Sequence, residues 1–151
     1  MGIDAEHGYV VTMHDCVFCR IIARKQPASF VAEDETTVAF MDLRQAVPGH
    51  VLVVPRRHAP TIYDLAPDEG AAVMNLAIRV ARSQRRVFAP AGLNLWQSNG
   101  EIAGQEVDHF HLHLHPRAAG DGIWQVYPNG APAPRTQAYL DELAARLRPH
   151  I

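Results

Sequence analysis

The sequence lacks a long apolar run, an excess of charge of either sign and a cysteine framework. Its 14 Lys and Arg residues against 16 Asp and Glu residues give a formal net charge of −2, which argues against the broad cationic face that binds a nucleic-acid polymer. No apolar run approaches the roughly 20 residues that a membrane-spanning helix needs. The opening residues, MGIDAEHGYVVTMHD, lack the basic and apolar segments of a secretory signal. We therefore expect a cytoplasmic protein with no membrane or nucleic-acid partner.

The two cysteines, Cys16 and Cys19, are too few for a disulfide-stapled fold, which agrees with a reducing compartment. A chain of 151 residues with 48% hydrophobic residues can instead bury a core of its own. We expect residues 1–12 to be a disordered tail, with Met1 or Met13 as the true start, and residues 13–151 to form a single domain.

Hydrophobic periodicity predicts a short helix capped by Asp15, a long helix over residues 67–88 and an amphipathic helix near the C-terminus. In the long helix the apolar residues at helical spacing are Val73, Leu76, Val80 and Val87. Five runs predict strands, namely 30–33, 37–41, 51–54, 93–97 and 109–115. This order of elements predicts an α+β fold with an antiparallel sheet of about five strands and two main helices.

Four of the nine histidines alternate along one heptapeptide, HFHLHLH, which spans residues 109–115. On a strand they would share one face at a spacing of about 6.5–7 Å, while Phe110, Leu112 and Leu114 face the core. The first and last histidine would then lie roughly 20 Å apart, too far to bind one ion together. A solvent-exposed polar face would be the simplest explanation of the alternating histidines, but histidine has no special propensity for strands. The pattern favours metal ligation or phosphoryl chemistry.

The segment GQEVDHFHLHLHPR, residues 104–117, resembles the signature of the histidine triad (HIT) superfamily, His-φ-His-φ-His-φ-φ, in its bacterial form. CVFCRIIARKQPA resembles the opening helix of that family, VAFMDLRQAVPGHVLVVPRRH its central strands, and LNLWQSNGEIAGQEV the approach to the triad. Counting from both ends of the signature identifies the triad as His109, His111 and His113. His115 then stands where the family usually has an apolar residue, and a register shifted by two residues is the alternative.

The resemblance implies that His111 attacks the α-phosphorus of a nucleotide and forms a covalent nucleotidyl-imidazole. Its other ring nitrogen would be held by a backbone carbonyl, and His113 would stabilise charge on the phosphate. Glu106 stands where some relatives have a serine that helps to protonate the leaving group. A carboxylate would do this only when protonated, or would orient water in the second step.

The resemblance also implies a nucleotide site. Asp42 matches the acid that binds the ribose hydroxyls, and either Ser98 or Asn99 matches a nucleotide-contacting residue. The backbone N–H groups after Gly104 would cradle the phosphate. The further residues of this expected site are Phe18, Ile21, Phe40, Met41 and Leu43 in the base pocket, and Gln105 and Val107 in the phosphate loop.

Cys16 and Cys19, three residues apart, have three interpretations: a redox pair, small core residues, or two thiolate ligands of a tetrahedral zinc ion. No strand precedes them as in a redox βαβ unit. The resemblance supplies two further ligands, His58 of the PRRH stretch and His109. A closed site with these four ligands would be structural, since it leaves no position for a substrate.

We therefore expect a HIT hydrolase or transferase for a purine nucleotide or nucleotide conjugate, most similar to a purine nucleoside phosphoramidase, with a structural zinc ion. A dinucleoside polyphosphate hydrolase and a non-enzymatic nucleotide-binding protein are the alternatives. Relatives of the phosphoramidase type pair into homodimers, and the apolar stretch 73–80 of the long helix is the expected contact.

Overall fold

The structure, a computed structural model, describes residues 16–123 and 126–151. The expected tail, residues 1–12, and the expected helix cap, Asp15, lie outside the described residues. The chain divides into two compact units, one ending at Asp121 and the other running from Gly122 to Ile151. The single domain expected over residues 13–151 stays a prediction.

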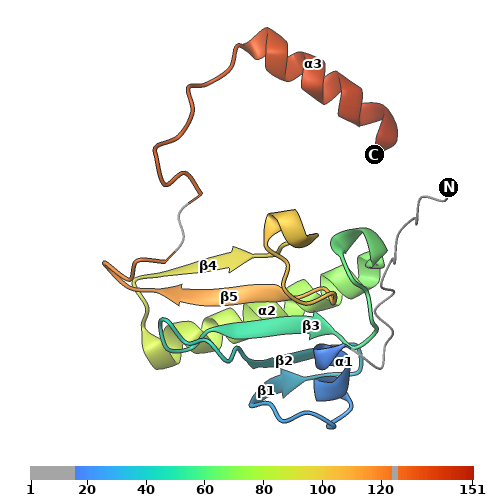
Figure 1. Ribbon diagram of the computed structural model, residues 1–151, viewed down its shortest axis with the longest axis vertical. Helices are drawn as coiled ribbons and strands as arrows, with labels where there is room; N and C mark the ends of the chain where they lie inside the picture. The colour runs from blue at the N-terminus through green and yellow to red at the C-terminus, as the bar shows by residue number, and fades with distance from the viewer. Residues whose placement is uncertain (1–15, 124–125) are drawn as a thin grey trace, which may run out of the picture. The chain divides into compact units, whose positions relative to one another are not determined.

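The first unit contains one five-stranded antiparallel sheet in the order β1-β2-β3-β5-β4, which confirms the predicted fold class (Figure 1). The strand bounds are Phe30–Glu33 for β1, Thr37–Met41 for β2, Val51–Pro55 for β3, Gly92–Trp96 for β4 and Leu112–Arg117 for β5. The last strand in sequence thus lies between β3 and β4 and pairs antiparallel with both. This insertion places the histidines of the HFHLHLH segment in the middle of the unit.

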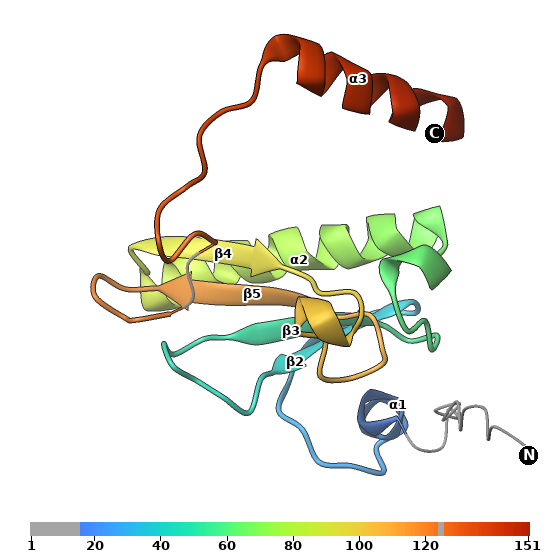
Figure 2. The same cartoon turned by 45° about the horizontal axis from the view of Figure 1, so that its top comes forward.

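Two helices of the first unit pack on opposite faces of this sheet (Figure 2). The short helix α1, Val17–Ile22, is capped by Cys16, whose Sγ accepts from the Cys19 N–H at 3.5 Å. The long helix α2, Pro67–Phe88, begins with a proline. At the same end the Glu69 carboxylate accepts a hydrogen bond from the Ala66 N–H at 2.9 Å. The short 3-10 turns η1, Ile62–Asp64, and η2, Glu101–Ala103, lie in the loops around the sheet.

The second unit contains the helix α3, Gln137–Leu147, and a final turn η3, Arg148–His150. Thr136 caps α3 by accepting from the Tyr139 N–H at 3.3 Å. No residue of α3 is buried. Within the described residues, no helix is long and apolar enough to cross a membrane.

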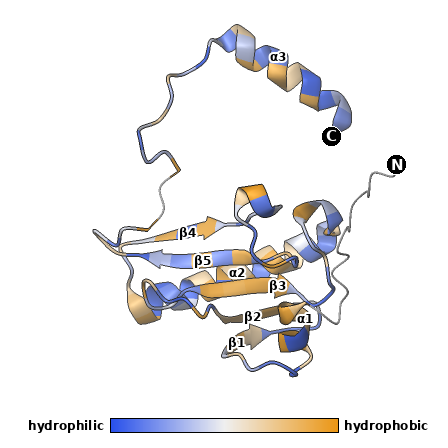
Figure 3. Cartoon of the chain, viewed as in Figure 1, coloured by the Kyte–Doolittle hydropathy of each residue, from blue (hydrophilic) through white to orange (hydrophobic). Residues whose placement is uncertain are grey.

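Side-chain alternation along the central strands builds two cores. Val51 and Val53 of β3 pack toward Val73, Leu76 and Val80 of α2. The intervening residues of β3 pack with α1 on the other face, in a cluster of Cys16, Phe18, Ile21, Val38, Phe40, Leu52 and Val54. Burial on both faces explains why β3 is a continuous apolar run, which Figure 3 shows beside the more polar β5.

Two details of the predicted elements are wrong. The last strand begins at Leu112 and not at His109, because the Phe110 N–H bonds to the Ala59 carbonyl at 2.6 Å and not to a neighbouring strand. His109 and His111 therefore lie in the loop that leads into β5. In α2, Val87 is 68% exposed, because it lies in the last turn, beyond the part of the helix that the sheet covers.

Candidate active site and metal group

Four ligand-type side chains converge where α1 meets the loop before β5. The Sγ and nitrogen atoms of Cys16, Cys19, His58 and His109 all lie within 4.8 Å of one another. The Cys16 Sγ lies 3.5 Å from His109 Nδ1, while the Cys19 Sγ lies 3.4 Å from His58 Nδ1 and 3.6 Å from His109 Nδ1. These four residues are the set that the sequence predicted from three separate segments.

The separations fit a tetrahedral zinc ion. Zn–S bonds of about 2.3 Å and Zn–N bonds of about 2.0–2.1 Å place sulfur and nitrogen ligands about 3.5–3.6 Å apart. The second ring nitrogen of His109, Nε2, donates to the Pro55 carbonyl at 2.9 Å. This bond leaves Nδ1 free to face the thiols, as a second partner does for a metal-ligating histidine.

The protonation of these groups matters for metal binding. Burial, together with the neighbouring Cys16 thiol, raises the pKa of the Cys19 thiol to about 12, so a cation would have to displace its proton. Burial likewise lowers the pKa of His109 to about 4, so this imidazole is neutral near pH 7. A neutral imidazole is the ligand form, and a bound cation would compensate the two thiolates.

His111 lies beside this group with its ring orientation fixed. Its Nδ1 donates to the His109 carbonyl at 2.6 Å, which leaves Nε2 as the unprotonated nitrogen. The Phe18 ring packs edge-on against it at a centroid distance of 5.2 Å. Burial lowers the pKa of His111, while the His109 carbonyl, Asp42 and Glu106 act in the opposite direction. The neutral imidazole is the nucleophilic form.

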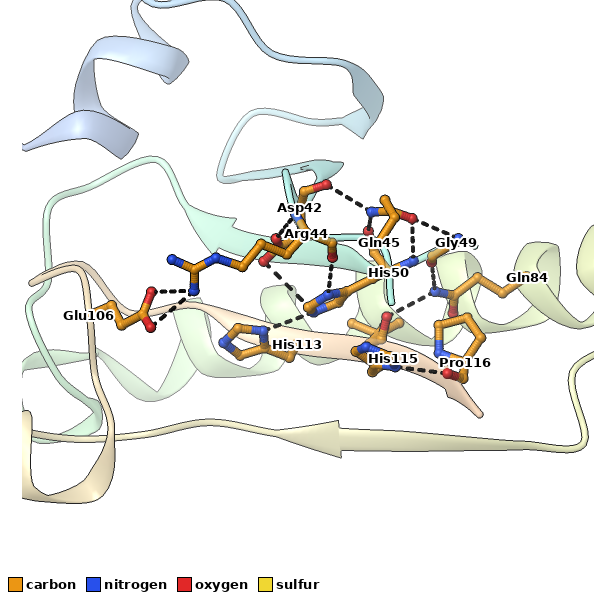
Figure 4. Close-up of polar contacts among 11 residues, drawn as sticks. Asp42, Arg44, Gln45, Gly49, His50, Gln84, Glu106, His113, His115 and Pro116 are labelled. Atoms are coloured by element: carbon orange, nitrogen blue, oxygen red, sulfur yellow. Dashed lines mark hydrogen bonds and ion pairs between the residues drawn. The ribbon is translucent and has the colours of Figure 1, made fainter. Parts of the chain in front are cut away.

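His113 pairs with His50, a histidine whose role was not predicted from the sequence. His50 Nδ1 donates to the Arg44 carbonyl at 3.1 Å, so its Nε2 accepts from His113 Nδ1 at 3.0 Å (Figure 4). Burial, together with the nearby His111, His50 and His115, lowers the pKa of His113 to about 3. The Trp96 ring stacks on His113 at a centroid distance of 4.8 Å.

His115 is not a solvent-exposed residue at the end of the strand. It is buried, its Nδ1 donates to the Pro116 carbonyl at 2.7 Å, and its ring lies 4.3 Å from the His50 ring. Trp96 covers it as well, at 5.2 Å. His115 thus packs within the unit and does not line the cavity next to His111 and His113.

Two adjoining cavities open beside His111. The first, of about 330 Å³, is largely apolar, and its walls include Phe18, Ile21, Phe40, Met41 and Leu43. These are the residues predicted for a base pocket, although the side chain of Leu43 is 97% exposed. The second cavity, of about 260 Å³, is lined by His50, His111, His113, Trp96 and Gly104, among others.

The residues shared by both cavities include Asp42, Arg44, Glu106 and Val107. Asp42 Oδ1 accepts from the Arg44 N–H at 2.6 Å, and its Oδ2 lies 3.9 Å from His50 Nε2. The Arg44 guanidinium binds both carboxylate oxygens of Glu106, at 3.0 and 2.9 Å. This exposed ion pair lies at the junction of the two cavities and occupies both carboxylate oxygens of Glu106.

Three predicted nucleotide contacts lie outside these two cavities. The Gln105 side chain braces the loop, accepting from the Gly100 N–H at 2.7 Å and donating to the Pro60 carbonyl at 2.6 Å. Asn99 Oδ1 accepts from the Ile62 N–H at 2.7 Å, which connects the loop after β4 to the η1 turn. Ser98 lines neither cavity. A nucleotide contact by these side chains stays a prediction.

The hydrogen bonds that hold the loop between β2 and β3 were not predicted from the sequence. The Gln45 amide closes the loop between β2 and β3 by bonding the Asp42 and His50 carbonyls, both at 2.8 Å. Gln84 of α2 donates to the Gly49 carbonyl at 2.6 Å and to the Leu114 carbonyl at 3.1 Å. Gly49 has φ +102° and touches the Phe88 ring, where a Cβ would lie 2.7 Å from ring atoms. The resemblance of VAFMDLRQAVPGHVLVVPRRH to the family covers this loop, but it does not predict these hydrogen bonds.

Comparison with known proteins agrees with the site. Residues 23–120 match the HIT domain, and the chain belongs to the HIT family. It is 36% identical to the "Protein hit" of Bacillus subtilis over 137 residues, which cover 88% of this chain and 94% of that protein. It is 34% identical to an adenosine 5'-monophosphoramidase of Schizosaccharomyces pombe, over 75% of this chain and 85% of that protein.

Among solved structures, the chain is similar to a zinc-bound histidine triad family protein from Mycobacterium smegmatis. The two are 30% identical with a TM-score of 0.69, over 89% of this chain and 99% of that one. The fold and the family are therefore established, and the Cys16, Cys19, His58 and His109 group could hold a metal ion.

Proposed function

We propose that this chain is a nucleotide hydrolase or transferase that acts at an α-phosphorus through a covalent nucleotidyl-histidine, most similar to a purine nucleoside phosphoramidase. The observation that carries the proposal is His111, a buried neutral imidazole held by the His109 carbonyl at 2.6 Å next to the reaction cavity. The similarity to a monophosphoramidase supports the class of substrate.

In the first step, His111 Nε2 attacks the α-phosphorus and the bond to the leaving nitrogen breaks, with a proton from solvent going to the amine. In the second step, water attacks the adduct, which releases the nucleoside monophosphate and restores the imidazole. Bound phosphate supplies the negative charge that favours a protonated His113, which then donates to a phosphate oxygen. Glu106, held by Arg44 at the cavity junction, is placed to orient the incoming water.

The base would enter the apolar cavity between Phe18 and Met41, and Asp42, which lines both cavities, would accept from the ribose hydroxyls. In the metal group we propose a structural zinc ion. Zinc would fix the loop before β5 and take no part in the reaction, because all four ligand positions come from the protein.

We also propose a homodimer, with a corrected contact surface. The expected stretch 73–80 cannot supply the contact as a whole, because Val73, Leu76, Ala77 and Val80 are buried against the chain's own sheet. The exposed apolar residues of the same region are Met74 and Ile78 on α2 and Leu95 on the edge strand β4.

The decisive experiment measures release of AMP from adenosine 5'-phosphoramidate and from a dinucleoside polyphosphate, in wild type and in His111→Ala. We expect faster turnover of the phosphoramidate and no turnover by the variant, which keeps nucleotide binding because Asp42 and the apolar cavity are intact. Rapid acid quenching should trap a labelled adduct on a peptide spanning residues 105–117. Preference for the polyphosphate would favour the other hydrolase, and binding without turnover or adduct would favour a binding protein.

A further inference from the structure

A second group of ligand-type side chains lies outside the cysteine-containing group. One carboxylate oxygen of Asp42 and one ring nitrogen each of His50 and His113 all lie within 4.8 Å of one another. His50 Nε2 lies 3.0 Å from His113 Nδ1 and 3.9 Å from Asp42 Oδ2. All three residues line the smaller cavity or its junction with the larger one, and Figure 4 shows Asp42 and His113 on either side of His50.

We propose that Asp42, His50 and His113 form a second metal site, which takes a divalent transition-metal ion such as Zn²⁺ or Co²⁺ and inhibits the protein when filled. Two imidazoles and one carboxylate are a borderline donor set that suits these ions. Ligands at about 2.0–2.1 Å from a tetrahedral ion lie about 3.3–3.4 Å apart. The separations of 3.0 and 3.9 Å fall on either side of that value, and all three ligand atoms lie within 4.8 Å of one another, so small side-chain shifts would bring them to one ion.

The hydrogen bonds of the His50 and His113 imidazoles suit the binding of an ion. His50 donates its Nδ1–H to the Arg44 carbonyl, the second contact that orients a metal-ligating histidine, and so presents the Nε2 lone pair. His113 Nδ1 lies 3.0 Å from this lone pair and shares one proton with it. The ion would take the place of that shared proton, which would move to His113 Nε2, so that each ring offers one nitrogen to the ion.

The loop that carries His50 and Asp42 is rigid enough to act as a site. Gln45 bonds the carbonyls of both residues, and its Oε1 accepts from the Gly49 and His50 N–H groups at 2.8 and 3.1 Å. With two ligands on this loop and the third, His113, on β5, a three-ligand site leaves at least one position of the ion open toward the cavity. Such a site differs from the four-ligand cysteine group in having no thiolate.

Inhibition follows from the residues that the ion occupies. This part rests on the proposed function, in which Asp42 holds the ribose and His113 contacts the phosphate. An ion bound to both removes those two contacts together, so the ion and the nucleotide compete. The cysteine group, in contrast, contributes no residue to the walls of the two cavities, and filling it should leave substrate binding intact.

The test titrates Co²⁺ into full-length protein that already carries one equivalent of Zn²⁺, without nucleotide, at pH 7.5. We expect one further Co²⁺ per chain, with the visible d–d absorption of nitrogen and oxygen ligation and without a thiolate-to-cobalt charge-transfer band. His50→Ala and Asp42→Asn should each weaken this binding at least tenfold. Glu106→Gln is the matched control, because it removes one negative charge from the same cavity wall but no ligand, and it should bind Co²⁺ as wild type does.

A second measurement separates the site from its effect. AMP should weaken Co²⁺ binding in wild type, and Co²⁺ should inhibit AMP release in competition with substrate. Thermal unfolding shows whether each variant is folded, and His50→Gln replaces His50→Ala where the latter is not. Absence of a further Co²⁺, a thiolate band, or undiminished binding by folded His50 and Asp42 variants would overturn the site. Co²⁺ binding that AMP strengthens would overturn the inhibition alone, and inactive protein that still binds Co²⁺ would refute only the proposed function.

Discussion

Replacing His115 tests both the packing of His115 between His50 and Trp96 and the register of the triad. His115→Ala removes a buried ring from between His50 and Trp96, together with its hydrogen bond to the Pro116 carbonyl at 2.7 Å. The cavity costs about 2 kcal/mol, and the lost hydrogen bond about another 1 kcal/mol. For a domain of this size, a total of about 3 kcal/mol corresponds to a fall in Tm of roughly 6–12 °C.

The assay is thermal unfolding followed by circular dichroism, with the adduct assay run on the same samples at a temperature where both proteins are folded. His115→Leu is the control, because it fills most of the volume and should recover more than half of the lost Tm. Adduct formation should stay within a few-fold of wild type in both variants, since His115 lies outside the reaction cavity. A change in Tm below about 2 °C would refute the burial argument, given about 2–4 °C per kcal/mol. Loss of the adduct in His115→Leu, with activity kept in His111→Ala, would show that the triad register is wrong.

Two further predictions concern assembly and pH. Ile78→Glu places a charge on the exposed apolar surface of α2 and should convert the dimer to a monomer, as measured by sedimentation velocity. Arg79→Glu is the control and should leave the dimer intact. A monomeric wild type would contradict the proposed dimer. The pKa of His113 is about 3 when folded and about 6.5 when unfolded, so below pH 6.5 the unfolded chain binds a proton that the folded chain does not. The free energy of unfolding should therefore fall by about 2 kcal/mol from pH 7 to pH 5 through this residue, and urea unfolding should show a shallower fall in His113→Gln. An equal fall in both proteins would contradict the shift.

Local sequence signals were sufficient for the elements with a strong pattern. The continuous apolar run of β3 and the proline-bounded helix α2 were placed to within a residue, since periodicity and proline act within a few residues. The start of β5 was misplaced because alternation continues through His109 and His111, although the backbone there bonds to Ala59. A period of two predicts which face a side chain takes, but it does not reveal whether a neighbouring strand is present.

The residues of the candidate site could likewise be predicted only in part. The family signature brought His58 and His109 to the two cysteines across more than 35 residues of sequence, and the geometry of the group agrees. The resemblance covers His50 and Arg44 but does not indicate their partners. Those partners, His113 and Glu106, lie 63 and 62 residues away in the sequence. A single sequence does not reveal contacts of that kind.

Metal removal tests how the cysteine group is connected to His111, because His109 belongs to that group and contacts His111. The His109 ring faces the thiols through Nδ1, and its carbonyl holds His111 Nδ1 at 2.6 Å. Cys16→Ala should lose zinc and lower stability, since binding energy at such a site is folding energy. It should also slow adduct formation more than it weakens nucleotide binding, because the carbonyl that orients His111 shifts while Asp42 and the apolar cavity remain. Metal analysis, Tm, the quenched adduct and AMP affinity are measured on protein purified without chelators or a metal-affinity column. A zinc-free wild type with full stability would refute the metal assignment, and a zinc-free variant that forms the adduct at the wild-type rate would refute the coupling through His109.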